Sequence, residues 1–315
     1  MRRLVALLAF VYILLLMAGP QCAFADDAVS AAGTPPSDEV QNVPGASAEH
    51  NKQGIAFFEK KDYGAALLEF NRAIAEDPQN INALINRGLA FAGRGEYDAA
   101  IENLYYALNL KEDNTVALKH LAAIYFLTHQ YGKAVKTYDR IGTLNPLDYE
   151  IYTKQGIAFS ALGAREAPIE DFTRTIYLTT KYLPAFVGRG ISFTEQGKYK
   201  WAISDLDRAV SMSHDAPFVY LMRSEALAKA SLFKNALADL NKACALGYDE
   251  VCAAIKQSKA DIEAVTSTFV LQYAKKGADE ELYNASRSKL EGFFNDKKLS
   301  GMDGYFRDDL KPVTD

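Results

Sequence analysis

A repeat of 34 residues constrains this chain more than any other feature of its sequence. It begins near Ser47 and runs without insertion to about Tyr248, which gives six consecutive units. The eighth place of every unit is small: Gly54, Gly88, Ala122, Gly156, Gly190 and Ser224. The eleventh place is large and apolar: Phe57, Phe91, Tyr125, Phe159, Phe193 and Leu227. A fixed period of this length predicts supersecondary units that stack on one another.

The second half of each unit carries a matching pattern. The twentieth place holds Ala66, Ala100, Ala134, Pro168, Ala202 and Ala236, and the twenty-fourth holds Phe70, Leu104, Tyr138, Phe172, Leu206 and Leu240. Spacings of three and four residues place such side chains on one face of a helix. Each unit is therefore predicted to be a hairpin of two helices, in which small residues of one helix leave room for large residues of the other.

Glycine and proline mark the expected turns. Gly95-Glu96, Gly132-Lys133 and Gly197-Lys198 are predicted to separate the two helices of a unit. Asp77-Pro78 and Asn145-Pro146 are predicted to separate successive units.

The period and this pattern resemble the tetratricopeptide repeat family over about two thirds of the chain. The resemblance implies an all-α fold, a right-handed solenoid of six helical hairpins followed by capping helices, and a non-catalytic protein that binds other proteins. The expected units are 47–80, 81–114, 115–148, 149–182, 183–216 and 217–250. Two departures stand out. The fourth place lacks the tryptophan often found in the family, and Pro168 and Thr175 predict a loosened second helix in the fourth unit.

The flanking segments differ in composition from the array. Arg2, Arg3 and an apolar run to Ala18, followed by Ala23-Phe24-Ala25, predict a signal peptide over 1–25 and hence export to the periplasm of a Gram-negative bacterium. An uncleaved anchor and a lipid at Cys22 are the alternatives. Residues 26–46 are predicted to be a disordered linker, 251–296 capping helices and 297–315 a flexible tail.

Two cysteines stand at the end of the array. The stretch from Lys242 to Ala253 resembles the cysteine-bearing turn of Sel1-like repeats, which implies a disulfide between Cys244 and Cys252. The alternative is a pair of buried thiols.

The sequence shows no motif for catalysis, for a cofactor or for a metal. The four histidines lie apart, and carboxylates such as Glu166, Glu170 and Asp171 are expected to be solvated on helix exteriors. With 35 lysines and arginines against 40 aspartates and glutamates, nucleic acid is not an expected partner. We therefore expect a protein without enzymatic activity, without a cofactor and, after signal cleavage, without a membrane span.

The resemblance to the repeat family implies that the first helix of each unit lines a concave groove. The residues predicted to form it are Ile55, Phe58, Ile85, Leu89, Phe126, Ile157, Val187, Ile191 and Leu221. For any one of them, packing against the second helices is the alternative. Family members that bind chaperones hold a C-terminal carboxylate with lysine and asparagines. The corresponding positions here are Asn51, Ile55, Asn86, Val116 and His120, so only isolated amides match.

These observations favour an exported scaffold that binds an apolar peptide or an amphipathic helix, within an envelope assembly or secretion machine. The alternative is a regulatory subunit of a cell-wall or polysaccharide-processing enzyme. The oligomeric state is left open.

Overall fold

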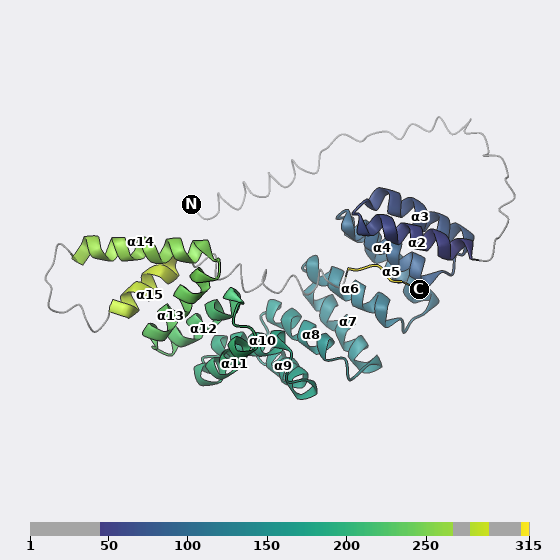
Figure 1. The fold of residues 1–315 in the computed structure, drawn as a ribbon. Helices are drawn as coiled ribbons and strands as arrows, with labels where there is room; N and C mark the ends of the chain where they lie inside the picture. Colours follow the sequence, from purple (N-terminus) through teal and green to yellow (C-terminus); the bar gives the residue numbers. More distant parts are fainter. Residues whose placement is uncertain (1–44, 267–277, 290–309, 315) are drawn as a thin grey trace, which may run out of the picture. The chain divides into compact units, whose positions relative to one another are not determined.

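The structure is a computed structural model, and it describes residues 45–266, 278–289 and 310–314 (Figure 1). The predicted signal peptide and most of the predicted linker lie outside these residues. All fourteen elements within them are α-helices. The six pairs of the array are α2 Ala46–Glu59 and α3 Tyr63–Glu76, α4 Ile81–Gly93 and α5 Tyr97–Leu110, α6 Thr115–Leu127 and α7 Tyr131–Leu144, α8 Tyr149–Ala161 and α9 Ala167–Leu178, α10 Leu183–Glu195 and α11 Tyr199–Met212, and α12 Pro217–Lys229 and α13 Phe233–Ala245.

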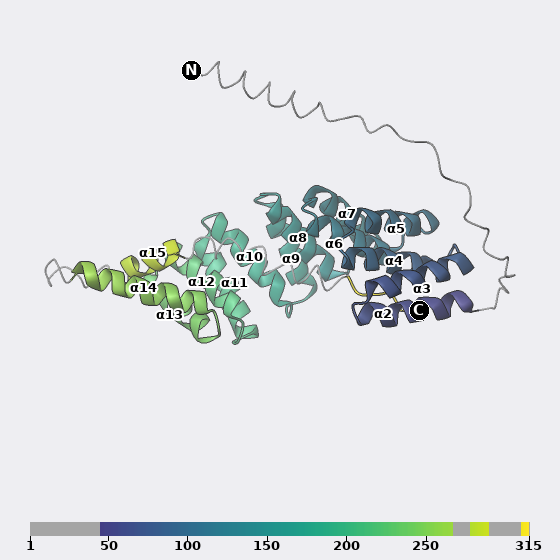
Figure 2. The ribbon, with the colours of Figure 1, turned by 90° about the horizontal axis from the view of Figure 1, so that it is seen from above.

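Each helix of the array packs against the next helix along the chain, and neighbouring first helices such as α2 and α4 also touch. The two views in Figures 1 and 2 show the hairpins following one another in sequence order. The predicted all-α solenoid of stacked hairpins is confirmed. Because each hairpin lends one face to its neighbour, most of the buried apolar residues form one continuous cluster from Leu84 to Tyr283.

The small residues of the eighth place do receive the large residues of the twenty-fourth. A methyl group added to Gly190 would lie 2.7 Å from Cγ of Leu206, and one added to Gly54 would overlap the ring of Phe70. Phe70 and Leu206 are completely buried. The two helices of a unit can approach this closely only because the glycine has no side chain.

The turn within each unit contains one residue in the left-handed backbone region, always at the fifteenth place. These residues are Lys61, Gly95, His129, Gly163, Gly197 and Ser231. The predicted turn at Gly132-Lys133 is wrong, because both residues belong to the first turn of α7. His129 takes the left-handed conformation there with φ 59°, so the chain reverses without a glycine.

The fourth unit departs from the others at its second helix. Helix α9 has 12 residues, whereas α3, α5, α7 and α11 have 14. Pro168 stands in its first turn, where a missing N–H removes no helical hydrogen bond. Thr175 replaces the usual alanine and is fully buried, where its hydroxyl donates to the carbonyl oxygen of Tyr149 at 2.9 Å. The helix is therefore shortened at its start.

Two further helices, α14 Asp249–Thr266 and α15 Ala278–Lys289, follow the array and pack against α13. Tyr283 of α15 is buried, with its ring 6.2 Å from that of Phe233. The predicted disulfide is present: Cys244 and Cys252 are bonded, with their Cα atoms 5.0 Å apart. It joins the end of α13 to the first turn of α14. No described helix is long and apolar enough to cross a membrane.

Candidate functional site

A short segment near the C-terminus, Leu310–Thr314, lies against the first helices of the array (Figure 1). Its contact with α4 is a pair of hydrogen bonds between Asn86 and the main chain of Val313. The Val313 N–H donates to Oδ1 of Asn86 at 2.6 Å, and Nδ2 of Asn86 donates to the Val313 carbonyl oxygen at 2.9 Å. A side-chain amide has one acceptor and one donor group, so it can pair with both polar groups of a single residue.

Asn51 of α2 holds this amide in place. Nδ2 of Asn86 also donates to Oδ1 of Asn51 at 3.0 Å, which fixes the orientation of the Asn86 side chain. Both asparagines are completely buried. Among the residues that the structure describes, the Nδ2 atom of Asn51 has no hydrogen-bond partner. Asn51 and Asn86 therefore form one buried polar pair, although they are 35 residues apart in the sequence.

The apolar side chains of the same segment are partly buried. Leu310 and Val313 pack against the main core cluster, which also contains Ile85, Leu89 and Phe126 of the predicted groove. The sequence predicts a flexible tail over 297–315, and for residues 310–314 the structure differs. These residues are held because Asn86 pairs with their main chain while the apolar cluster contacts their side chains.

Most of the predicted groove residues are buried in the array. Ile85, Leu89, Phe126, Ile157, Val187, Ile191 and Leu221 are all buried and belong to the main core cluster. Ile55 and Phe58 are only partly buried, and both pack on the first hairpin. For the seven buried residues the structure shows packing in the core, and their contact with a ligand stays a prediction.

A second arrangement connects neighbouring units through arginines at the seventh place. Arg189 donates to both carboxylate oxygens of Asp205 in its own unit at 2.7 and 2.8 Å, and to Thr173 of the preceding unit at 3.1 Å. Arg223 bridges Asp239 and Asp207 in the same way, with all three distances 2.7 Å. Arg87 makes the equivalent contacts with Asn103 and Asn71. We call these three side chains the arginine bridges.

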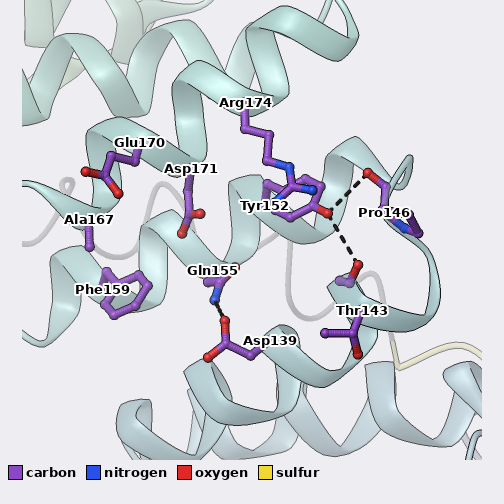
Figure 3. A pocket seen from close by; sticks show the side chains of 11 residues that line it. Asp139, Thr143, Pro146, Tyr152, Gln155, Phe159, Ala167, Glu170, Asp171 and Arg174 are labelled. Carbon is purple, nitrogen blue, oxygen red and sulfur yellow. Dashed lines mark hydrogen bonds between the residues drawn. The ribbon is translucent and has the colours of Figure 1, made fainter.

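The fourth unit has Gln155 where an arginine bridge would stand. Its Nε2 donates to Asp139 of the preceding unit at 2.5 Å. Asp171 stands where Asp205 and Asp239 stand in the next two units, and its buried Oδ2 atom has no hydrogen-bond partner within the described residues. A cavity of about 590 Å³ opens here between α7, α8 and α9, and Figure 3 shows Asp139, Gln155 and Asp171 on its wall.

Burial raises the pKa of Asp171 from 3.8 to about 7, and the nearby charge of Asp139 adds to the rise. Arg174 opposes it only in part, since its guanidinium stacks over the Tyr152 ring, 3.9 Å from the centroid. The expectation that this carboxylate is solvated is wrong, because the short α9 and the neighbouring helices enclose it. A sequence signal does point to this site. The arginine of each bridge is followed sixteen places later by aspartate or asparagine, and in the fourth unit the residue before Asp171 at that spacing is Gln155.

The remaining charged groups in the interior have structural partners. Glu225 is buried and pairs with Lys229 at 3.2 Å and with Arg287 of α15 at 3.8 Å, which connects the array to its cap. His50 contacts Glu69 at 2.7 Å within the first unit. Within the residues that the structure describes, no group of three histidine, cysteine or acidic side chains could hold a metal ion.

Comparison with known proteins agrees with this architecture. Two family models described as tetratricopeptide repeat match the chain, one over residues 51–117 and one over 91–154. Within residues 51–154 the chain therefore contains tetratricopeptide repeats.

Among curated proteins, it is similar to the small glutamine-rich tetratricopeptide repeat-containing protein 2 of Mycosarcoma maydis. The two are 31% identical over 126 residues, which are 40% of this chain and 34% of that protein. The chain spans about a third or less of the length of the curated relatives that it matches.

Among solved structures, the chain is similar to a tetratricopeptide repeat protein of Parabacteroides merdae. That likeness has a TM-score of 0.57 and 19% identity, and covers 76% of this chain and 98% of the other. Another similar structure is YrrB, described as a tetratricopeptide repeat protein with an unusual peptide-binding site. Here the TM-score is 0.50 and the identity 17%, over 60% of this chain and 97% of the other. At these identities the likeness establishes the fold.

Proposed function

We propose that this protein is an exported scaffold that binds an extended segment of a partner polypeptide on the first helices of its array, at Asn86. The observation that carries this proposal is the pair of hydrogen bonds between Asn86 and the main chain of Val313. They satisfy the main-chain N–H and C=O of a single residue without reading its side chain, and the adjoining apolar cluster supplies burial. This combination is how extended peptides are recognised on many protein surfaces.

Family likeness supports the same function. The repeats of the matched relatives and the peptide-binding site described for YrrB both point to a polypeptide ligand. A partner in an envelope assembly or secretion machine follows from the predicted signal peptide over 1–25. The disulfide agrees with an oxidising compartment, because such bonds persist there. A Sel1-like character of the cysteine turn remains part of the proposal.

The polypeptide ligand can be tested by selecting peptides from a random library on the immobilised protein. Enriched peptides are expected to bind the wild type and to lose about tenfold or more in affinity with Asn86→Ala, because one buried main-chain pair is lost. Asn71→Ala is the matched control, since this asparagine is exposed on α3 and contacts only an arginine bridge. Failure to enrich any peptide, or equal binding by the two variants, would refute this function.

Export has a separate test. The first 25 residues are fused to alkaline phosphatase, which is active only after translocation and disulfide formation, and the mature chain is examined by mass spectrometry. We expect active enzyme and an N-terminus at Asp26. An inactive fusion, or a mature chain that still begins at Met1, would remove the periplasmic part of the proposal.

A further inference from the structure

The peptide segment that occupies Asn86 in this structure belongs to the chain itself. We propose that Leu310–Thr314 is a resident ligand of the peptide site, so that a partner binds only by displacing it. This inference rests on the proposed function, because it identifies what competes for the same site. Its basis is the main-chain pair of Val313 with Asn86, together with the packing of Leu310 and Val313 on the apolar cluster.

The spacing of the resident segment defines the ligand chemistry of the site. Leu310 and Val313, three residues apart, pack on the apolar cluster, and Lys311 between them is exposed. Pro312 has no N–H, so it leaves no donor unpaired beside the Val313 contact. A competing partner is therefore an extended segment with two apolar side chains three apart and a free N–H at the second one.

The resident segment also leaves the site incompletely satisfied. Nδ2 of Asn51 is a buried donor without a partner in the described part of the chain, and it belongs to the amide that positions Asn86. An unpaired buried donor costs binding energy that a ligand with a suitably placed acceptor would recover. A segment of the same chain needs little intrinsic affinity, because covalent connection gives it an effective concentration that can be on the order of 1 mM. The segment can therefore occupy the site although it binds weakly, and a partner peptide with higher affinity can replace it.

Release of the tail is the first arm of the test. The double variant L310D/V313D places two carboxylates against the apolar cluster, which disfavours docking of the segment. T314D is the matched control, because Thr314 is exposed and contributes no contact to the argument. A fluorescein-labelled peptide with the sequence of residues 310–315 is titrated into each full-length protein. For a peptide with a Kd of about 0.1 mM, we expect about tenfold tighter binding to the released variant than to wild type or T314D.

Asn86→Ala added to the released variant is expected to weaken peptide binding by about tenfold or more, and Asn71→Ala to leave it unchanged. Circular dichroism of every variant checks that the helices remain folded. If the peptide binds the wild type and the released variant equally well, the tail does not occupy the site. If it binds neither, the segment is not a ligand. In both cases the proposal fails, while library-selected peptides that depend on Asn86 would leave the proposed function standing.

Hydrogen exchange supplies a readout that needs no added ligand. The Val313 amide is expected to exchange slowly in the wild type and in Asn71→Ala, and at the rate of an unstructured peptide in Asn86→Ala. Docking within one chain also predicts that its protection does not change with protein concentration. Fast exchange in the wild type, or protection that rises with concentration because a second copy donates the segment, would overturn the proposal.

Discussion

Gln155 donates a hydrogen bond to Asp139 at 2.5 Å, across the boundary between the third and fourth units. At the same place in the next unit, an arginine binds acceptors in two units at once. The shorter glutamine donates to Asp139 alone, and the buried Oδ2 of Asp171 has no hydrogen-bond partner in the part of the chain that the structure describes. In the fourth unit, Gln155 therefore connects to the preceding unit, whereas Arg189 and Arg223 also bind an acceptor in their own unit.

Replacing Gln155 by arginine should complete this bridge. A guanidinium can bind Asp171 and Asp139 together, as Arg223 binds Asp239 and Asp207, and the adjoining cavity leaves room for it. We expect the free energy of unfolding to rise by about 1.5–3 kcal/mol, the range for hydrogen bonds to charged groups. Urea denaturation measures the change. Gln155→Leu is the control and should lower stability; a Gln155→Arg protein no more stable than wild type contradicts the bridge.

The raised pKa of Asp171 makes stability depend on pH. Between pH 3.8 and about 7 the folded protein keeps a proton on Asp171 that the unfolded chain has released, so the free energy of unfolding falls as the pH rises through this window. Asp171→Asn removes this dependence. Its free energy of unfolding should exceed that of the wild type by up to about 4 kcal/mol at pH 8 and should equal it near pH 4.

Denaturation curves from pH 4 to pH 8 test this dependence, with Glu170→Gln as a control on the exposed face of the same helix. A stability difference between Asp171→Asn and wild type that is constant across the range would show that Asp171 titrates normally.

Left-handed turn residues give a further prediction. Ser231 has φ 62°, a conformation that costs a residue with a side chain about 1–2 kcal/mol and costs glycine little. Ser231→Gly should therefore stabilise the protein by about 1 kcal/mol, as judged by thermal unfolding. Gly95→Ala, at the equivalent place with φ 81° and open space around it, should destabilise by a similar amount. Changes of the same sign in both variants would argue against this explanation.

Reduction of the disulfide should loosen the end of the array selectively. The bond between Cys244 and Cys252 closes a short loop, for which the chain-entropy account gives about 2–3 kcal/mol. A C244S/C252S variant should exchange its amide hydrogens faster in α13 to α15, with little change in α2 to α5. Hydrogen exchange measured by mass spectrometry separates these regions. Uniformly faster exchange along the whole chain would mean that the bond acts globally.

The periodic part of the fold could be predicted from the sequence because its physics is local. Helix spacing predicts that the small residues of one helix of a unit leave room for large residues of the other, and Gly54 beside Phe70 is one such contact. His129 shows where this reasoning failed. His129 takes the left-handed conformation of the turn although it is not a glycine. The prediction relied on Gly132 and therefore placed the turn three residues too late in the chain.

The peptide site depends on a contact that no local pattern encodes. Asn86 and Val313 are 227 residues apart in the chain, and nothing in the spacing around either residue indicates their pairing. The burial of Asp171 follows from the shape of three helices around it. The arginine bridges, by contrast, stand at the seventh place of the second, fifth and sixth units, where the other three units have Gln53, Leu121 and Gln155. Comparing this place between units could have pointed to Gln155.

The central claim is that Asn86 recognises the main chain of an extended peptide, and a single methyl group tests it most directly. The peptide of residues 310–315 is synthesised with and without an N-methyl group on Val313, and both are titrated calorimetrically into the L310D/V313D protein. Methylation removes the donor to Oδ1 of Asn86 and keeps every side chain. We predict that affinity falls by about tenfold or more. Equal affinities for the two peptides would contradict main-chain recognition by Asn86.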